Sequence, residues 1–227
     1  MTLGQNGSLD LSAVDADAMN LNRAASIADL AVGAGQSVAS LLATLKDQAT
    51  AAQNPSLDAG ARQALNTDFK AVLGQIASTV SQASFDGVNL IDGQTPAGLN
   101  LSAGAGGGAA LSLSAQNLTL GGPVVTLAST SSLGTPTAAT AALADISSSL
   151  DNIQTALGAL SSQANQVSAH SSILNELTGV LQAGTAANAD SGADGARLLA
   201  LQIQQQLSGQ SQPIANQSPQ LVLSLFR

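Results

Sequence analysis

Side chains that could take part in catalysis are few and scattered along this chain. His170 is the only histidine, and its neighbours are Ala169 and Ser171 rather than an acid that would orient an imidazole base. Serine is so common that no single hydroxyl stands out, and there is no Gly-x-Ser-x-Gly nucleophile motif. We interpret His170 as a surface or seam-edge residue of a helix, and we expect the chain not to be an enzyme.

Metal and cofactor sites are also not indicated. Asp15 with Asp17 and Asp190 with Asp194 supply carboxylates, but no loop has the ligand spacing of a Ca²⁺ site. We interpret both pairs as helix N-terminal capping and solvated charge. The glycine-rich stretch "SAGAGGGAA" lacks the Lys-Ser or Lys-Thr that completes a phosphate-binding loop, so we interpret it as a flexible loop.

Composition excludes several classes of partner. The 227 residues include 14 acids and 6 bases, for a net charge of −8, so no basic cluster is available to bind nucleic acid. There is no cysteine and hence no disulfide framework. The first ten residues lack the basic and apolar regions of a cleavable signal peptide. No apolar run approaches the roughly 20 residues of a membrane span, so we expect no membrane contact.

Two helices are predicted in the first part of the chain. The first ends near Asn54-Pro55, because the residue before a proline avoids the α region. The second opens at Ser56 or Asp58, and the short break makes the two helices antiparallel neighbours. Apolar residues and alanines at three- and four-residue spacing support both. The stripes are Ile27, Leu30, Ala34, Val38, Leu41, Leu45, Ala49 and Ala52, then Ala61, Leu65, Phe69, Val72, Ile76, Val80 and Ala83.

The middle of the chain changes its pattern to short alternating runs. The stretch "SFDGVNLIDG" supplies turn chemistry at Asp86-Gly87 and Asp92-Gly93. Runs at 111–113, 118–120 and 124–127 alternate apolar and polar residues between turn signals. We therefore predict small β-hairpins between Asp86 and about Leu133.

The strongest periodicity follows this middle segment. Its residues predict a coiled-coil helix that extends through Leu181 and is about 60 Å long, with packing in an ordinary helix bundle as the alternative. A last helix is predicted after a segment of small residues, and glutamines lie between the positions of its apolar stripe. The two stripes are Leu143, Ile146, Leu150, Ile153, Leu157, Leu160, Ala164, Val167, Ser171 and Leu174, then Leu199, Ile203, Leu207, Ile214, Leu221 and Leu225.

These elements predict a mainly α fold. Long antiparallel helices form a coiled-coil rod with a small β-hairpin element in the middle. We divide the chain into five parts. They are a poorly structured segment 1–19, the N-terminal helices 20–85, a hairpin and glycine-rich spacer 86–137, a long coiled-coil helix 138–187, and a C-terminal helix 188–227.

Two stretches of sequence resemble a known family. The C-terminal "DSGADGARLLALQIQQQLSGQSQPIANQSPQLVLSLFR" is similar to the C-terminal signature of bacterial flagellins. The stretch from Leu41 to Gly93, which ends on Phe-Asp-Gly-Val-Asn-Leu, resembles the flagellin segment in which one helix turns back as a second. The resemblance covers roughly Asn20 to Arg227 and is nearest to the short flagellins of alphaproteobacteria. Family members normally begin with about 50 further residues, a helical segment that this sequence lacks.

The resemblance implies a structural subunit of the bacterial flagellar filament, which serves motility. Such subunits are exported unfolded by a type III route without a cleavable signal peptide. They self-assemble outside the cell, their terminal helices lining an inner tube and longer helices an outer tube. Implied partners are further copies of the chain, an export chaperone, and hook-associated and cap proteins. The alternative is a flagellin-like hook-filament junction protein, or a surface-displayed binding module unable to polymerise alone.

The resemblance also implies two sets of contact residues. The polymerisation and chaperone interface would comprise Ile203, Leu207, Ile214, Asn216, Gln217, Leu221 and Leu225. The helix equivalent to the one read by the innate receptor for flagellin would present Leu42, Thr44, Leu45, Lys46 and Gln48. Thr44 stands where enteric flagellins carry an arginine, while Lys46 keeps the basic character of its position. We therefore expect weak or no receptor recognition.

Overall fold

A computed structural model of the chain describes residues 11–95, 97–102, 110–187 and 201–204. Three helices account for most of it: α1 (Leu11–Ala52), α2 (Ala59–Gln82) and α3 (Pro136–Ala187). Two short strands, β1 (Leu99–Ser102) and β2 (Ala110–Leu113), form one antiparallel hairpin. The prediction of a mainly α fold with a small hairpin is confirmed.

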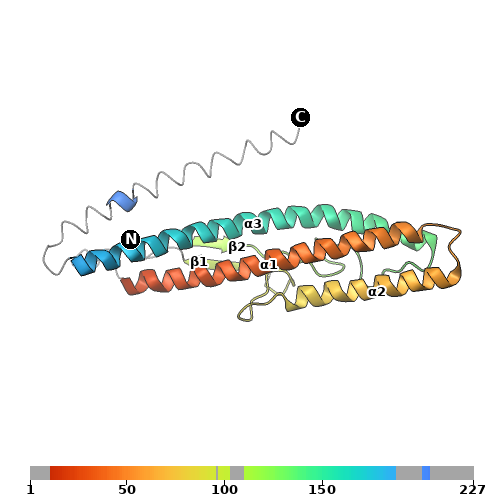
Figure 1. Ribbon diagram of the computed structural model, residues 1–227, viewed down its shortest axis with the longest axis horizontal. Helices are drawn as coiled ribbons and strands as arrows, with labels where there is room; N and C mark the ends of the chain where they lie inside the picture. Colours follow the sequence, from red (N-terminus) through yellow and green to blue (C-terminus); the bar gives the residue numbers. More distant parts are fainter. Residues whose placement is uncertain (1–10, 96, 103–109, 188–200, 205–227) are drawn as a thin grey trace, which may run out of the picture.

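The helices form an elongated rod (Figure 1). α1 and α3 lie side by side and antiparallel, with Asn22 opposite Ser171 at one end and Gln53 opposite Thr140 at the other. α2 returns along the C-terminal half of α1, and the hairpin lies beside the other half. The 52 residues of α3 make it about 78 Å long, so it exceeds the predicted length.

The prediction that residues 1–19 are poorly structured is wrong for the part that the structure describes. α1 is already helical at Leu11, and Val14, Ala18 and Leu21 are buried. Of the predicted stripe, Leu30 is exposed and Ala34 and Leu41 are half-buried, while its other residues are buried. Val14, Ala18 and Leu21 continue the three- and four-residue spacing toward the N-terminus. The intervening Asp15 and Asp17 obscured this pattern, although an amphipathic helix carries charges between its buried positions.

The turn between α1 and α2 has two side-chain caps. Asp58 is the N-cap of α2, and its carboxylate accepts from the Ala61 N–H at 2.8 Å. Arg62 reaches back to the end of α1 and donates to the Ala52 carbonyl at 2.6 Å and to the Asn54 carbonyl at 2.8 Å. A positive charge beside the carbonyls at a helix C-terminus is favourable, so Arg62 fixes α2 against the end of α1.

The spacer between α2 and α3 differs from the predicted series of hairpins. Among its described residues, β1 and β2 are the strands that pair, with Leu99 opposite Leu113. Residues 118–120 and 124–127 are not strands, although Leu118, Val125 and Leu127 are buried. Alternation therefore identified segments with a buried side, but it did not establish that each has a neighbouring strand.

Side chains of α3 replace the missing strand partners. Ser149 is fully buried, and its hydroxyl oxygen accepts from the Thr126 N–H at 3.0 Å and the Leu127 N–H at 3.3 Å. The Asn152 side-chain amide donates to the Val124 carbonyl at 3.3 Å. These bonds satisfy buried backbone groups that would otherwise be costly to desolvate. The spacer is therefore attached along α3 rather than folded as a separate sheet.

The start of α3 follows its sequence closely. Thr135 caps the helix by accepting from the Ala138 N–H at 3.1 Å, and Pro136 takes the first helical position, where its missing N–H costs nothing. This start lies two residues before the predicted boundary at 138.

The buried face of α3 is broader than the predicted coiled-coil seam and shifted from it. Ile146, Ile153 and Leu160 are fully buried, as predicted, whereas Leu143, Leu150 and Leu157 are only half-buried. The buried positions between them are Ala142, Ser149 and Ala156. Small residues there let α1 and the spacer approach the helix backbone, and the leucines flank the contact. A two-stranded seam would bury the leucines instead.

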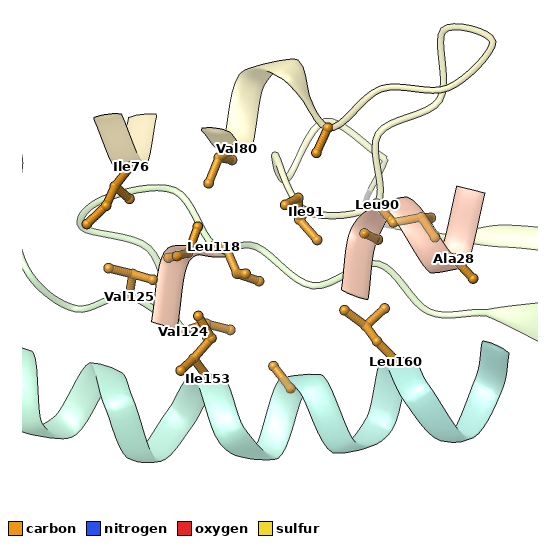
Figure 2. Packing of buried hydrophobic residues seen from close by; sticks show 14 of the residues in the cluster. Ala28, Ile76, Val80, Leu90, Ile91, Leu118, Val124, Val125, Ile153 and Leu160 are labelled. Atoms are coloured by element: carbon orange, nitrogen blue, oxygen red, sulfur yellow. The ribbon is translucent and has the colours of Figure 1, made fainter. Parts of the chain in front are cut away.

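The core runs the length of the rod and is aliphatic. Figure 2 shows buried side chains of the spacer, including Leu90, Ile91 and Leu118, in the space between α2 and α3. Phe69 is the only fully buried aromatic side chain of the described part. Spacer residues therefore supply much of the core that binds the helices together.

Gly35 is a point of tight contact between α1 and α3. A Cβ atom built at this position would lie 2.6 Å from Cδ2 of Leu157, which is below any ordinary contact distance. Gly33, two residues earlier, has no atom within 4 Å of the equivalent point and is exposed. The Leu157 side chain therefore occupies the space that a larger residue at position 35 would need.

α1 also departs from one expectation based on composition. Its residues Val14–Ala52 are long and apolar enough to cross a membrane, by length and composition alone, whereas no such segment was expected. No charged residue lies between Asp29 and Lys46, and alanine, valine and leucine raise the hydropathy there. A core helix passes the same criteria, and the larger apolar residues of α1 pack mainly against the rest of the rod.

We predict that replacing each of the two glycines of α1 by leucine has a different effect on stability. Gly35→Leu should lower the free energy of unfolding by about 1–3 kcal/mol, because it overpacks the contact with Leu157. Gly33→Leu is the matched control and should leave stability unchanged or raise it by up to about 1 kcal/mol through helix propensity. Thermal unfolding followed by circular dichroism would compare them. Equal effects at both positions would contradict the packing assigned to Gly35.

We predict that the Arg62 cap contributes measurably to stability. Arg62→Met keeps a long aliphatic side chain but removes both hydrogen bonds, and should cost about 1–3 kcal/mol. Lys70→Met, on the exposed surface of the same helix, should change stability by less than about 0.5 kcal/mol. Denaturant unfolding of both variants tests this, and a cost at position 62 no larger than at position 70 would rule out the cap.

Candidate assembly surfaces

The groups considered for catalysis do not form a site. His170 is half-buried on α3, and its Nδ1 lies 3.0 Å from the Gln166 carbonyl one turn earlier. No group of three histidine, cysteine, aspartate or glutamate residues that could hold a metal ion occurs within the described residues.

The capping role predicted for the two aspartate pairs can be checked for one pair. Asp15 and Asp17 lie beyond the first turn of α1, so the expectation that they cap the helix N-terminus is wrong. They are partly exposed helical residues whose charge meets solvent. Asp190 and Asp194 lie outside the described residues.

The motif "FDGVNLIDG" builds a junction between α2, the spacer and α1. Phe85 and Val88 exchange two backbone hydrogen bonds of 3.0 Å around Asp86 and Gly87. Both central residues have positive φ, 51° and 77°, as a type I′ turn requires. The predicted Asp-Gly turn is therefore present.

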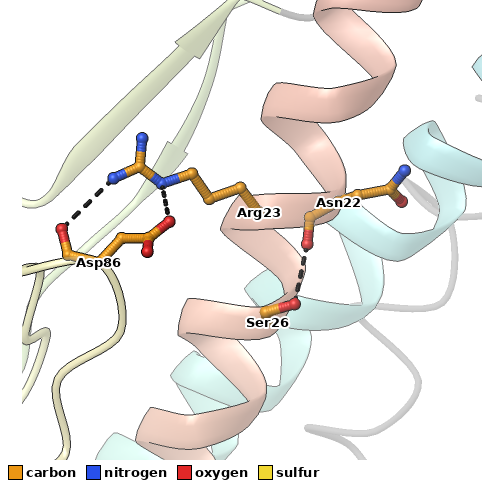
Figure 3. Close-up of polar contacts among 4 residues, drawn as sticks. All are labelled: Asn22, Arg23, Ser26 and Asp86. Carbon is orange, nitrogen blue, oxygen red and sulfur yellow. Dashed lines mark hydrogen bonds and ion pairs between the residues drawn. The ribbon is translucent and has the colours of Figure 1, made fainter.

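Arg23 of α1 holds this turn in place (Figure 3). Its Nε lies 2.9 Å from the Asp86 carboxylate, and its Nη2 donates to the Asp86 carbonyl at 3.4 Å. Both side chains are about half exposed, so the pair orients the turn more than it stabilises the fold. The sequence did not identify Arg23 as its partner, because 63 residues separate the two.

Asn89 is the buried polar residue of the same motif. Its side-chain amide donates to the Val80 carbonyl of α2 at 2.7 Å, and its side-chain oxygen accepts from the Ile91 N–H at 2.9 Å. Asn89 thus satisfies a carbonyl near the end of α2 and shapes the loop that carries Leu90 and Ile91 into the core. The motif is a structural joint.

The receptor-equivalent residues divide between the core and the surface. Leu42 and Leu45 are fully buried, and Thr44 and Lys46 are exposed. Gln48 is half-buried, and its Oε1 is a buried atom with no hydrogen-bond partner within the described part of the chain. Of these five residues, Thr44 and Lys46 therefore have exposed side chains.

Most of the predicted polymerisation residues lie outside the described part of the chain. Ile203 is the exception, and it is half-buried against the core of the rod. Its neighbour Leu201 is 55% exposed. The remaining residues, for which the structure offers no placement, are Leu207, Ile214, Asn216, Gln217, Leu221 and Leu225.

Comparison with known proteins agrees with this architecture. The family model described as "Bacterial flagellin N-terminal helical region" matches residues 4–95, which extends the resemblance upstream of Asn20. Flagellin FljJ of Caulobacter vibrioides is 38% identical over 196 residues, which cover 86% of this chain and 71% of FljJ. Flagellin FljM of the same organism is 35% identical over 225 residues, which cover 98% of this chain and 81% of FljM.

A solved structure has the same fold. The crystal structure of Bacillus cereus flagellin aligns with a TM-score of 0.59 at 17% identity, covering 81% of this chain and 94% of that one. With the sequence relatives, it confirms the resemblance carried by the two motif stretches. The chain belongs to the bacterial flagellin family and is a structural subunit of the extracellular flagellar filament.

Proposed function

We propose that the chain contributes to the filament through two parts with different roles. Residues 20–85 and 138–187, joined by the spacer 86–137, form an outer-tube rod, and residues 188–227 form the inner, polymerising layer. The observation that carries this proposal is the continuous core of the rod, whose buried residues run from Val14 to Ala52 along α1 and from Ala139 to Leu177 along α3. A rod that buries its own apolar stripes needs no neighbour to fold, which leaves the C-terminal stripe to join one copy to the next.

The proposed role is structural and does not involve catalysis. Support comes from the placement of His170 and the aspartates and from the family, whose members are filament subunits. The side chains that would supply chemistry instead cap helices, hold turns or face solvent.

The C-terminal segment is the proposed contact for other proteins. Its stripe would line the inner tube in the filament, and an export chaperone would hold the same residues before assembly. The stripe consists of Ile203, Leu207, Ile214, Leu221 and Leu225, with Asn216 and Gln217 as polar contacts. Hook-associated and cap proteins would meet the ends of the polymer. Export would proceed without a cleavable signal peptide.

Weak recognition by the innate receptor is proposed for the surface of α1. Leu42 and Leu45 are committed to the core, so recognition would depend on the exposed Thr44 and Lys46. The Thr44 hydroxyl donates to the Ser40 carbonyl at 3.2 Å. It therefore cannot replace the bidentate hydrogen bonds that an arginine guanidinium would offer.

We predict that the C-terminal stripe is required for assembly. The double variant Leu221→Ser and Leu225→Ser should remove sedimentable filaments and weaken binding to the export chaperone, because both contacts bury these leucines. The unfolding temperature of the rod should not change. Ser218→Ala, in the same segment, is the control and should assemble normally. Filaments of the double variant that match the unaltered chain in electron micrographs would refute this role.

We predict that one substitution strengthens receptor recognition. Thr44→Arg adds a second exposed basic side chain two residues from Lys46, and should raise the response of receptor-expressing reporter cells above that of the unaltered chain. Thr50→Arg, also exposed on α1, controls for added charge alone. A response of the unaltered chain as strong as that of an enteric flagellin would contradict weak recognition.

A further inference from the structure

Two Asp-Gly pairs lie close together in the described part of the chain, and their surroundings differ. Asp86-Gly87 forms the tip of the turn after α2, and Asp92-Gly93 follows six residues later. Aspartate before glycine is prone to cyclise to a succinimide, because glycine has no Cβ to hinder attack by its own amide nitrogen on the aspartyl carboxyl carbon. Whether each pair reacts therefore depends on how the fold holds it.

The second pair is held by its neighbours. Asp92 is half-buried, and its carboxylate accepts from the Gln94 N–H at 2.8 Å. A Cβ atom built on Gly93 would lie 2.7 Å from Nδ2 of Asn117, so the side chain of Asn117 covers this glycine. Ring closure here would have to displace packed groups, and the fold opposes it.

The first pair is open. The Asp86 side chain is 54% exposed, and nothing lies within 4 Å of a Cβ atom built on Gly87. The two hydrogen bonds of the turn use the N–H groups of Phe85 and Val88. The Gly87 N–H donates to no backbone carbonyl within the described part of the chain. The attacking nitrogen and the space around it are therefore both available.

Arg23 holds the carboxylate of this open pair away from that nitrogen. Figure 3 shows the Asp86 carboxylate and the Asp86 main-chain carbonyl both turned toward the guanidinium. Nε lies 2.9 Å from the carboxylate, and Nη2 donates to the carbonyl at 3.4 Å. In a planar trans peptide the Gly87 N–H points away from that carbonyl oxygen. The ion pair thus keeps the carboxyl group on the oxygen side of the peptide, and it must open before the ring can close.

We propose that Asp86-Gly87 is a site of spontaneous isoaspartate formation, and that opening of the ion pair with Arg23 controls its rate. In the reaction, the Gly87 nitrogen bonds to the carboxyl carbon of Asp86 in its neutral acid form. The proton of that nitrogen leaves with the carboxyl hydroxyl group as water. Water then adds back to the cyclic imide, and cleavage of the bond between the nitrogen and the original main-chain carbonyl carbon gives isoaspartate. The overall change is an isomerisation and consumes no reagent.

The modification changes the joint to which this turn belongs. Isoaspartate routes the main chain through the former side chain, which adds one carbon atom to it. The turn has two residues between Phe85 and Val88, so the added atom disrupts the two 3.0 Å hydrogen bonds that close it. Asn89, whose side chain binds the end of α2, follows directly. Arg23 therefore protects the connection between α2 and the spacer.

Digestion with endoproteinase Asp-N measures both pairs in one sample, because this enzyme cleaves before aspartate but not before isoaspartate. The full chain is incubated folded at neutral pH, then denatured, digested and examined by mass spectrometry. The bond before Asp86 should become resistant with time, while the bond before Asp92 stays cleavable. Labelling of the resistant fragment by protein isoaspartyl methyltransferase identifies the product. Resistance that develops first at Asp92, or at neither pair, would overturn the assignment of the site.

Variants of Arg23 test its control of the rate. Arg23→Met should raise isoaspartate at position 86 about two- to fivefold, the population ratio that an exposed ion pair sets. Arg23→Lys keeps the charge and should give a smaller increase. Lys46→Met, the matched control, removes an exposed positive charge about six helical turns along α1 and should react like the unaltered chain.

Unfolding separates the effect of the fold from that of the sequence. In concentrated urea the unaltered chain and Arg23→Met should isomerise at equal rates, and positions 86 and 92 should react alike. Equal rates for these two chains in the folded state would refute the control by Arg23. An excess in Arg23→Met that persists in urea would refute it as well.

Discussion

The close packing of α1 on α3 is the contact on which the rest of this structure depends. The two helices meet where Gly35 accommodates Leu157, and small buried residues of α3, Ala142, Ser149 and Ala156, let the packed elements approach its backbone. Without aromatic bulk, the core gains its stability from many small contacts over a long distance. The spacer and α2 then attach to a pair of helices whose relative position is already determined.

Periodicity predicted the features that each segment encodes by itself. The long helices, the break at Asn54-Pro55 and the Asp86-Gly87 turn depend on spacing, on a proline and on residues that tolerate positive φ. The family resemblance depended on the same local features, together with the C-terminal signature. These signals are contained in a few neighbouring residues and can therefore be read without a structure.

Features that depend on distant partners were not predictable in this way. The predicted stripe of α3 included its leucines, because large apolar side chains are usually buried. In the structure Ser149 and Ala156 are buried instead, where neighbouring elements pack closely against the helix. Residues 118–120 and 124–127 alternate like strands, but their backbone groups do not join a ladder and bind a serine on α3 or a neighbouring loop instead. Arg23 and Arg62 gained structural roles only through carbonyls that the fold brings within reach. Tertiary context decided each of these cases.

The distance in sequence between the contacts of α1 and α3 also bears on when the rod can form. Gln53 and Thr140 are 87 residues apart, and Asn22 and Ser171 are 149 residues apart. Closing loops of this length is entropically costly, and folds dominated by such distant contacts form slowly. Until the second half of the chain has been synthesised, the apolar face of α1 lacks its principal partner. A nascent subunit therefore cannot bury the full apolar face of α1 until α3 has been synthesised.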